Sequence, residues 1–160
     1  MKQFLLAMPL AMLPVTAIAQ DVPVLAQYWT DSGSLPPEYA WETSVTIFAD
    51  HSLTLRHCTG YETEGPACKT RKAKVTDDQI QAILTAATES GLLQTPARDL
   101  PEDMIPVGGG VTGGSVTLDG QVISLVAFPA VEDAARVAMV LQAIHAAIPE
   151  RLRQRFMDES

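Results

Sequence analysis

Cys58 and Cys68 are the residues best placed to form a defined covalent structure, because they are the two cysteines of the chain. Joined to each other, they would close a ring of about eleven residues, which a disulfide stabilises by about 3 kcal/mol if the chain-entropy account applies. The loop between them carries Tyr61, Glu62 and Glu64. We expect it to be either a pre-ordered recognition loop or a stapled hairpin end that binds nothing.

A metal site is the sharpest chemical alternative, because His51 and His57 lie close to the cysteines in sequence and supply imidazole ligands. However, His57 and Cys58 are adjacent, so on a strand their side chains point to opposite faces and cannot share one ion without a bulge. Two cysteines in an exported chain also favour a disulfide over a metal site. We therefore expect no bound metal and no cofactor.

Sequence motifs for catalysis are missing from the chain. It has no Cys-x-x-Cys, Gly-x-Ser-x-Gly or His-Glu-x-x-His pattern. The glycine run 108–114 precedes an expected strand, whereas a phosphate-binding loop opens a helix, so we interpret the run as a flexible or bulged lead-in to a hairpin. We assign no catalytic residue. A small hydrolase or a metal-binding protein with a pocket near this run is the alternative function.

Both tryptophans, Trp29 and Trp41, lie in residues 20–43, which we interpret as an N-terminal arm that crosses the surface. The polar and proline-rich stretch 31–37 interrupts any regular structure there. The rings either hold the arm against the body or form an aromatic recognition surface.

Residues 1–19 have the pattern of a secretory signal peptide, with Lys2, an apolar stretch and the small-x-small site Ala17-Ile18-Ala19. Cleavage between Ala19 and Gln20 would release a periplasmic or secreted protein. No later apolar run is long enough to span a bilayer, so we expect no membrane insertion after cleavage.

The composition is acidic, with 19 Asp and Glu against 11 Lys and Arg and a formal net charge of −8. Loss of Lys2 with the signal peptide would change it to −9. This balance disfavours nucleic acid as a partner. A protein or another envelope component is the expected partner, and no feature of the sequence specifies the oligomeric state.

Alternating apolar residues over 43–57 predict a hairpin with a turn at Asp50-His51. Lys69–Val75 is expected as a third strand, and its basic residues indicate either an edge strand or a patch that binds anions. The Asp119-Gly120 turn predicts a second hairpin, whose later strand, 121–128, is apolar on both faces and therefore expected at the centre of the sheet.

Two amphipathic helices are predicted. The first begins at the capping box Thr76–Gln79 and ends at Ser90-Gly91, and the second spans 130–148 and stops at Pro149. Residues 149–160 are expected to form a polar tail, or else one short helical piece in which Leu152 and Phe156 dock on the body.

The order hairpin, helix, hairpin, helix predicts a single α+β domain over residues 44–148, with a small antiparallel sheet packed on one face by two helices. This order resembles that of small secreted protease-inhibitor domains. We expect a non-enzymatic exported module that binds a partner, in an inhibitor-like manner, through the stapled Cys58–Cys68 loop.

Overall fold

The structure is a computed structural model that describes residues 22–60, 67–106 and 108–157. Its centre is a six-stranded antiparallel sheet with the strand order β4-β3-β2-β1-β5-β6. The strands are β1 (Val24–Asp31), β2 (Trp41–Phe48), β3 (Ser52–Thr59), β4 (Ala67–Lys74), β5 (Val111–Leu118) and β6 (Gln121–Leu125). The helices are α1 (Asp77–Glu89), α2 (Val131–Ala147) and α3 (Glu150–Phe156), with short 3-10 turns at Pro37–Tyr39 and Glu102–Met104.

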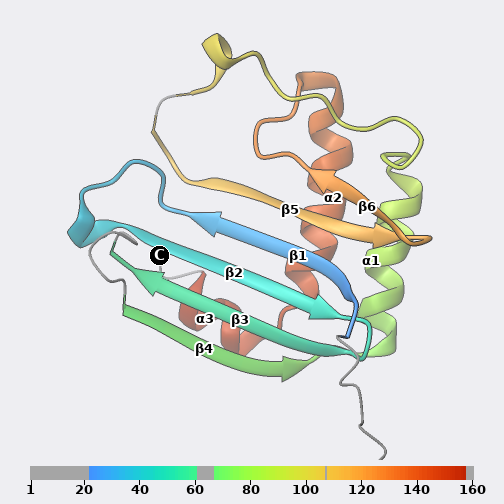
Figure 1. Ribbon diagram of the computed structural model, residues 1–160, viewed down its shortest axis with the longest axis horizontal. Helices are drawn as coiled ribbons and strands as arrows, with labels where there is room; N and C mark the ends of the chain where they lie inside the picture. The colour runs from blue at the N-terminus through green and yellow to red at the C-terminus, as the bar shows by residue number, and fades with distance from the viewer. Residues whose placement is uncertain (1–21, 61–66, 107, 158–160) are drawn as a thin grey trace, which may run out of the picture.

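All three of these helices lie on the same face of the sheet, and the described chain leaves the other face without a helix (Figure 1). The predicted α+β class with an antiparallel sheet and helices on one face is therefore confirmed. The structure adds one strand, β1, and a third helix, α3, which the sequence predicts only as an alternative. We call the uncovered side the helix-free face.

The first predicted hairpin is confirmed as β2 and β3, which pair from Trp41 opposite Thr59 to Ile47 opposite Leu53. His51 occupies the turn with a positive φ of 67°. The carboxylate of Asp50 accepts a hydrogen bond from the backbone amide of Ser52 at 3.0 Å, which fixes the turn locally. The register of β2 and β3 is thus defined at the end away from the cysteines.

The third strand and the first helix are also where the sequence predicts them. β4 pairs with β3 and forms one edge of the sheet. At the start of α1, the Thr76 hydroxyl accepts from the Gln79 amide at 3.2 Å, and the Gln79 side chain accepts from the Thr76 amide at 2.8 Å. This reciprocal capping box satisfies two backbone donors at the helix start.

The interpretation of residues 20–43 as a surface arm is wrong for Val24–Asp31. This segment is the central strand β1, paired with β2 on one side and β5 on the other. Buried Ala26 and Tyr28 alternate with exposed Gln27 and Trp29, which is the period of a strand with one covered face. The body of the domain therefore begins before residue 44.

Two further expectations are corrected at the other end of the chain. β6 lies at the edge of the sheet and not at its centre, and Val122 on its outer side is 72% exposed. Residues 150–156 are helix α3 and not a polar tail, because Leu152 and Phe156 are buried against the body. The helical alternative for this segment is the correct one.

The main core lies between the sheet and the helices. It contains fully buried side chains from each layer, including Ile47, Leu53, Leu55, Ile83, Leu125, Val137, Val140 and Ile144. In the part of the chain described, no helix is both long and apolar enough to cross a membrane. Residues 1–19 and the Ala19–Gln20 bond lie outside the described residues, so the signal peptide stays a prediction.

Candidate functional site

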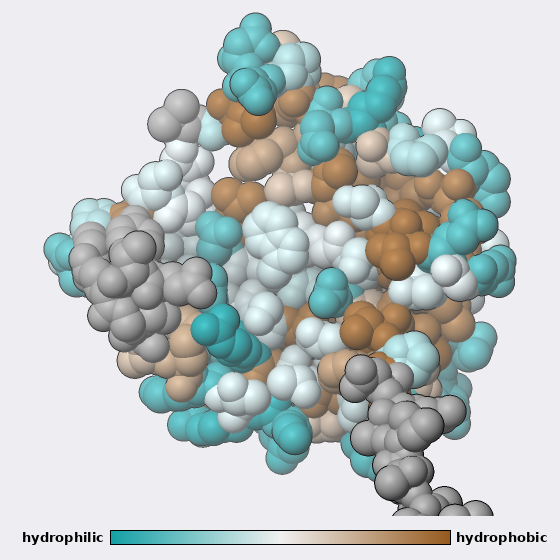
Figure 2. Space-filling view, in the orientation of Figure 1, coloured by the Kyte–Doolittle hydropathy of each residue, from teal (hydrophilic) through white to brown (hydrophobic). Residues whose placement is uncertain are grey.

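The helix-free face displays every second side chain of β1, β2 and β3, because neighbouring residues of a strand point to opposite sides. Gln27 and Trp29 come from β1, Glu42 and Ser44 from β2, and Arg56 from β3; all of these side chains are exposed. Figure 2 shows hydrophilic and neutral residues over the middle of this face, with hydrophobic residues gathered toward the right of the view.

Trp29 lies on this face above β5. Gly113 is its partner in the register of β1 and β5, and a Cβ atom built on Gly113 would lie 2.5 Å from Cζ2 of the indole. The ring therefore occupies the space that a side chain at residue 113 would need. Trp29 nevertheless remains 38% exposed, so part of its aromatic surface is available for contact.

A shallow hollow of about 260 Å³ opens beside this ring. Its lining residues come from three adjacent strands: Trp29, Thr30, Asp31, Glu42, Thr43, Ser44 and Arg56. We call this place the Trp29 hollow. It combines one aromatic surface with charged and hydroxyl groups, which is the mixture found in surfaces that bind other proteins.

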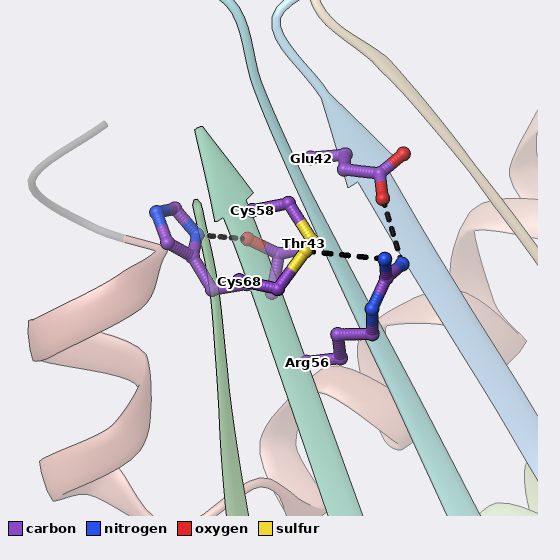
Figure 3. Close-up of a disulfide and its surroundings, with 6 residues drawn as sticks. Glu42, Thr43, Arg56, Cys58 and Cys68 are labelled. Atoms are coloured by element: carbon purple, nitrogen blue, oxygen red, sulfur yellow. Dashed lines mark hydrogen bonds and ion pairs between the residues drawn. A yellow bond between two sulfur atoms is a disulfide. The ribbon is translucent and has the colours of Figure 1, made fainter. Parts of the chain in front are cut away.

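Arg56 connects the Trp29 hollow to the disulfide (Figure 3). Its guanidinium donates to Glu42 Oε1 at 2.9 Å and to the sulfur of Cys68 at 3.1 Å. Both partners are exposed, so the ion pair itself contributes at most about 1 kcal/mol to stability. Its larger effect is to hold the guanidinium in one position over the sheet.

The predicted Cys58–Cys68 disulfide is present and joins directly opposed residues of β3 and β4, with Cα atoms 4.1 Å apart. Cys58 is fully buried, whereas Cys68 is exposed. Tyr61, Glu62 and Glu64 lie outside the described residues, so their part in recognition stays a prediction. The disulfide fixes the two strand ends from which that loop leaves.

Trp41 does not share a surface with Trp29. It lies on the opposite side of the sheet, where its ring stacks on His57 with centroids 6.4 Å apart. His57 in turn contacts Phe156 of α3 at 5.5 Å. An aromatic recognition surface formed by both tryptophans is therefore excluded, and Trp41 belongs to the contact between β2, β3 and α3.

His57 is held by hydrogen bonding and packing. Its Nδ1 lies 2.8 Å from the hydroxyl of Thr43, and burial, together with the charge of Lys69, lowers the pKa of the imidazole. His51 is elsewhere, with Nε2 3.5 Å from the carboxylate of Asp77. Among the described residues, no group of three or more His, Cys, Asp or Glu side chains could hold a metal ion.

A second hollow, of about 290 Å³, lies at the glycine-rich strand on the helix side of the sheet. It is lined by Tyr28, Thr112, Ala138, Leu141, Gln142 and His145. Burial raises the pKa of Tyr28, an effect partly opposed by a hydrogen bond with Thr112. The rings of Tyr28 and His145 are 5.7 Å apart. This hollow lies beside the glycine run, near which the alternative function expects a pocket.

The glycine run itself allows close backbone contacts. Gly113 makes room for Trp29, and a Cβ atom on Gly114 would lie 2.2 Å from the carbonyl oxygen of Gln27. At the start of the run, the carbonyl oxygen of Gly109 would meet a Cβ atom on Gly33 at 1.9 Å. Glycines thus let β5 and its lead-in lie tightly against β1 and the turn that follows it.

The sequence does not identify the other lining residues of the Trp29 hollow, among them its three charged residues, Asp31, Glu42 and Arg56. The signal for two of them was in the chain, since alternation along β2 and β3 places Glu42 and Arg56 on the side opposite Val45 and Leu55. Glu42 and Arg56 are beside Trp29 because β1 belongs to the sheet, and no pattern in the sequence predicts that.

Comparison of the chain with models of protein families finds no match. Comparison with curated proteins finds no match either. Function therefore has to be inferred from the geometry of the molecule.

Proposed function

We propose that the protein is an exported, non-enzymatic binding module that recognises a protein of the cell envelope through the helix-free face at its disulfide end. Residues 1–19 serve as a signal peptide cleaved between Ala19 and Gln20, and the mature protein acts in the periplasm or is secreted. The Cys58–Cys68 bond agrees with this compartment, because disulfides persist in oxidising environments.

The observation that carries the proposal is the position of Trp29 on an uncovered sheet face, partly exposed and beside a hollow that contains charged groups. The ring packs on Gly113 on one side and stays partly exposed on the other, so its free surface is available to a partner. Tryptophan and arginine are among the residue types that contribute most to binding energy at protein interfaces. Trp29 and Arg56 place both types on one surface.

Pre-organisation supports the same proposal. The indole is seated over Gly113, and the guanidinium of Arg56 is held by Glu42 and Cys68. Side chains already held in one conformation lose less entropy when a partner binds. β3 and β4, which the loop with Tyr61, Glu62 and Glu64 connects in the chain, end beside the disulfide, and we propose that this loop takes part in the same recognition.

A pull-down of envelope proteins with the tagged mature protein tests this function. We expect a specific partner to be retained by the wild type and lost with Trp29→Ala, because removal of the indole removes the largest aromatic contact. Met139→Ala is the matched control, since Met139 is similarly exposed, at 41%, but lies on α2. The combined variant Tyr61→Ala and Glu62→Ala tests the loop separately.

Retention of every envelope protein by Trp29→Ala at the wild-type level would contradict the proposal, provided that circular dichroism shows the variant to be folded. Loss of the partner with Met139→Ala and not with Trp29→Ala would move the recognition surface to the helices.

A small hydrolase is the second candidate, favoured by the hollow lined by Tyr28, Thr112 and His145 near the glycine run. Turnover of p-nitrophenyl acetate that disappears in His145→Ala would support it. Absence of turnover in the wild type, together with no metal by elemental analysis, would count against both the hydrolase and the metal-binding alternative.

A further inference from the structure

A cationic groove lies between the edge strand β4 and helix α3, on the side of the sheet opposite the Trp29 hollow. It has a volume of about 290 Å³ and is lined by Arg71, Lys72, Arg151, Leu152, Arg155 and Phe156. Four of these six residues are basic, in a protein whose formal net charge is −8. Figure 1 shows α3 behind β3 and β4, which is the arrangement that brings the two basic segments together.

The base of the cationic groove is apolar and fixed. Leu152 and Phe156 are 6% and 4% exposed, so both are anchored in the body of the domain. The guanidinium carbons of Arg71 and Arg155 lie 5.9 and 5.4 Å from the centroid of the Phe156 ring. Cation–π attraction at these distances holds the two arginines around one ring although they belong to different elements.

The charges of the cationic groove are not neutralised within the described chain. None of the ion pairs among the described residues includes a basic residue of the groove. Their cationic members are Arg56, Arg98, Arg136, Arg153 and His51. The nearby carboxylate of Glu150 is paired with Arg153. Like charges brought together without counterions repel each other, and an anionic partner would remove that repulsion.

The backbone of β4 adds a second binding element. β4 ends the sheet, so its outer edge has no neighbouring strand in the part of the chain that the structure describes. Such an edge offers a row of unpaired amide and carbonyl groups to an extended peptide. Arg71 and Lys72 belong to this strand, so the free edge and the cationic groove are continuous.

We propose that the cationic groove and the edge of β4 together bind an acidic segment of a partner protein in an extended conformation. The segment pairs with β4, places carboxylates on Arg71 and Arg155, and rests an apolar side chain on Phe156. An inorganic anion would use the charges but neither the apolar base nor the strand edge, which is why a peptide fits this site better.

Selection from a library of random octapeptides tests the proposal on the mature protein. We expect enrichment of peptides in which an Asp or Glu and an apolar residue are two positions apart, because residues i and i+2 of an added strand face the same side. One enriched peptide, labelled with a fluorophore, is then titrated by anisotropy. Binding should weaken when sodium chloride is raised from 50 to 300 mM, as expected for charge pairs open to solvent.

The variant Arg71→Gln with Arg155→Gln should bind this peptide at least tenfold more weakly. Its matched control is Gln81→Glu with Thr85→Glu on exposed positions of α1, which makes the protein more negative by the same two charges. The control should bind within twofold of the wild type. Trp29→Ala should also bind normally, so failure here is distinguishable from failure of the proposed function.

A copy of the peptide with N-methyl groups on alternate amides tests strand pairing, because methylation removes the backbone donors. Two such peptides are compared, one methylated on the odd amides and one on the even amides. If both bind as tightly as the unmethylated peptide, the proposed pairing with β4 is wrong. The site would be overturned if no acidic peptide were enriched, or if the Arg71→Gln and Arg155→Gln variant bound the peptide as tightly as the wild type does. Binding of inorganic phosphate without binding of any peptide would also overturn it.

Discussion

The indole of Trp29 lies so close to the backbone of Gly113 that a single Cβ atom there would approach Cζ2 to 2.5 Å and Cε2 to 2.8 Å. The two residues are opposed in the pairing of β1 with β5, although 84 positions separate them in the chain. The position of the indole therefore depends on a glycine at residue 113, and the shape of the Trp29 hollow depends on both residues.

Gly113→Ala should displace the indole of Trp29. The added methyl group also meets the carbonyl oxygen of Leu125 at 3.1 Å, so the ring has to move or the strands have to separate. We expect a loss of about 1–3 kcal/mol in the free energy of unfolding, as for other overpacked sites. Urea unfolding followed by tryptophan fluorescence measures it, in a Trp41→Phe background so that Trp29 is the one tryptophan.

Ser115→Ala is the control for this substitution, because residue 115 lies on the same strand and the same face. It should change stability by less than about 0.5 kcal/mol, the range of ordinary surface changes. An emission spectrum of Gly113→Ala identical to that of its parent would show that the ring is not seated on residue 113.

Removal of the disulfide should lower stability without changing the sheet. Cys58→Ala with Cys68→Ala opens a ring of about eleven residues, and the chain-entropy account then predicts a loss of about 3 kcal/mol. The midpoint of urea unfolding reports this loss. An unchanged midpoint, with the bond shown intact in the wild type by mass spectrometry, would mean that the strand pairs alone fix this end of the domain.

Because of Asp133, the free energy of unfolding should decrease as the pH falls into the acidic range. Hydrogen bonds from Arg136 and from the backbone amide and side chain of Arg98 lower the pKa of this carboxyl to about 2 from its ordinary value of 3.8. Because the folded pKa is the lower one, the stabilisation is complete above pH 4 and is lost as the pH falls from about 4 to about 2. Unfolding by urea at a series of pH values should show this decline.

Asp133→Asn should flatten the decline over the same interval and lower stability at pH 7. Glu89→Gln is its control, because Glu89 is an exposed carboxylate outside the ion pairs of Arg98 and Arg136. A slope in Asp133→Asn equal to that of the wild type would assign the acid sensitivity to other carboxyl groups.

Phe156→Ala should separate α3 from the sheet. The ring is buried and contacts His57. The backbone carbonyl oxygen of Phe156 accepts a hydrogen bond from the Thr43 hydroxyl at 3.2 Å. We expect a loss of about 3 kcal/mol or more, which is typical for truncation of a buried aromatic ring. Thermal unfolding measures it. Gln154→Ala, an exposed change on the same helix, should leave the midpoint nearly unchanged, and equal effects of the two variants would contradict the docking of α3.

Local patterns in the sequence were sufficient for the elements whose partners are near in the chain. The β2–β3 hairpin, the capping box at Thr76 and the pairing of Cys58 with Cys68 each depend on residues within about 20 positions of one another. The class of the fold followed from their order. The positions of β1 and β6 did not, because β1 pairs with a strand more than 80 residues later.

The Trp29 hollow illustrates the same limit. Its strands were partly predicted, but Trp29 reaches Glu42 and Arg56 only because β1 is inserted between β2 and β5. Likewise, the basic residues of β4 were recognised as a strand edge or an anion patch. Arg151 and Arg155 joined them only once α3 was seen to dock beside β4.

Site-specific photocrosslinking in living cells tests whether the helix-free face is the recognition surface. A benzophenone amino acid is placed at Ser44, beside Trp29, and separately at Gln81 on α1, both exposed. We expect one crosslinked adduct of defined mass from Ser44 that disappears when Trp29 is also changed to Ala, and none from Gln81. Adducts from Gln81 alone, or an adduct from Ser44 that persists without the indole, would contradict it.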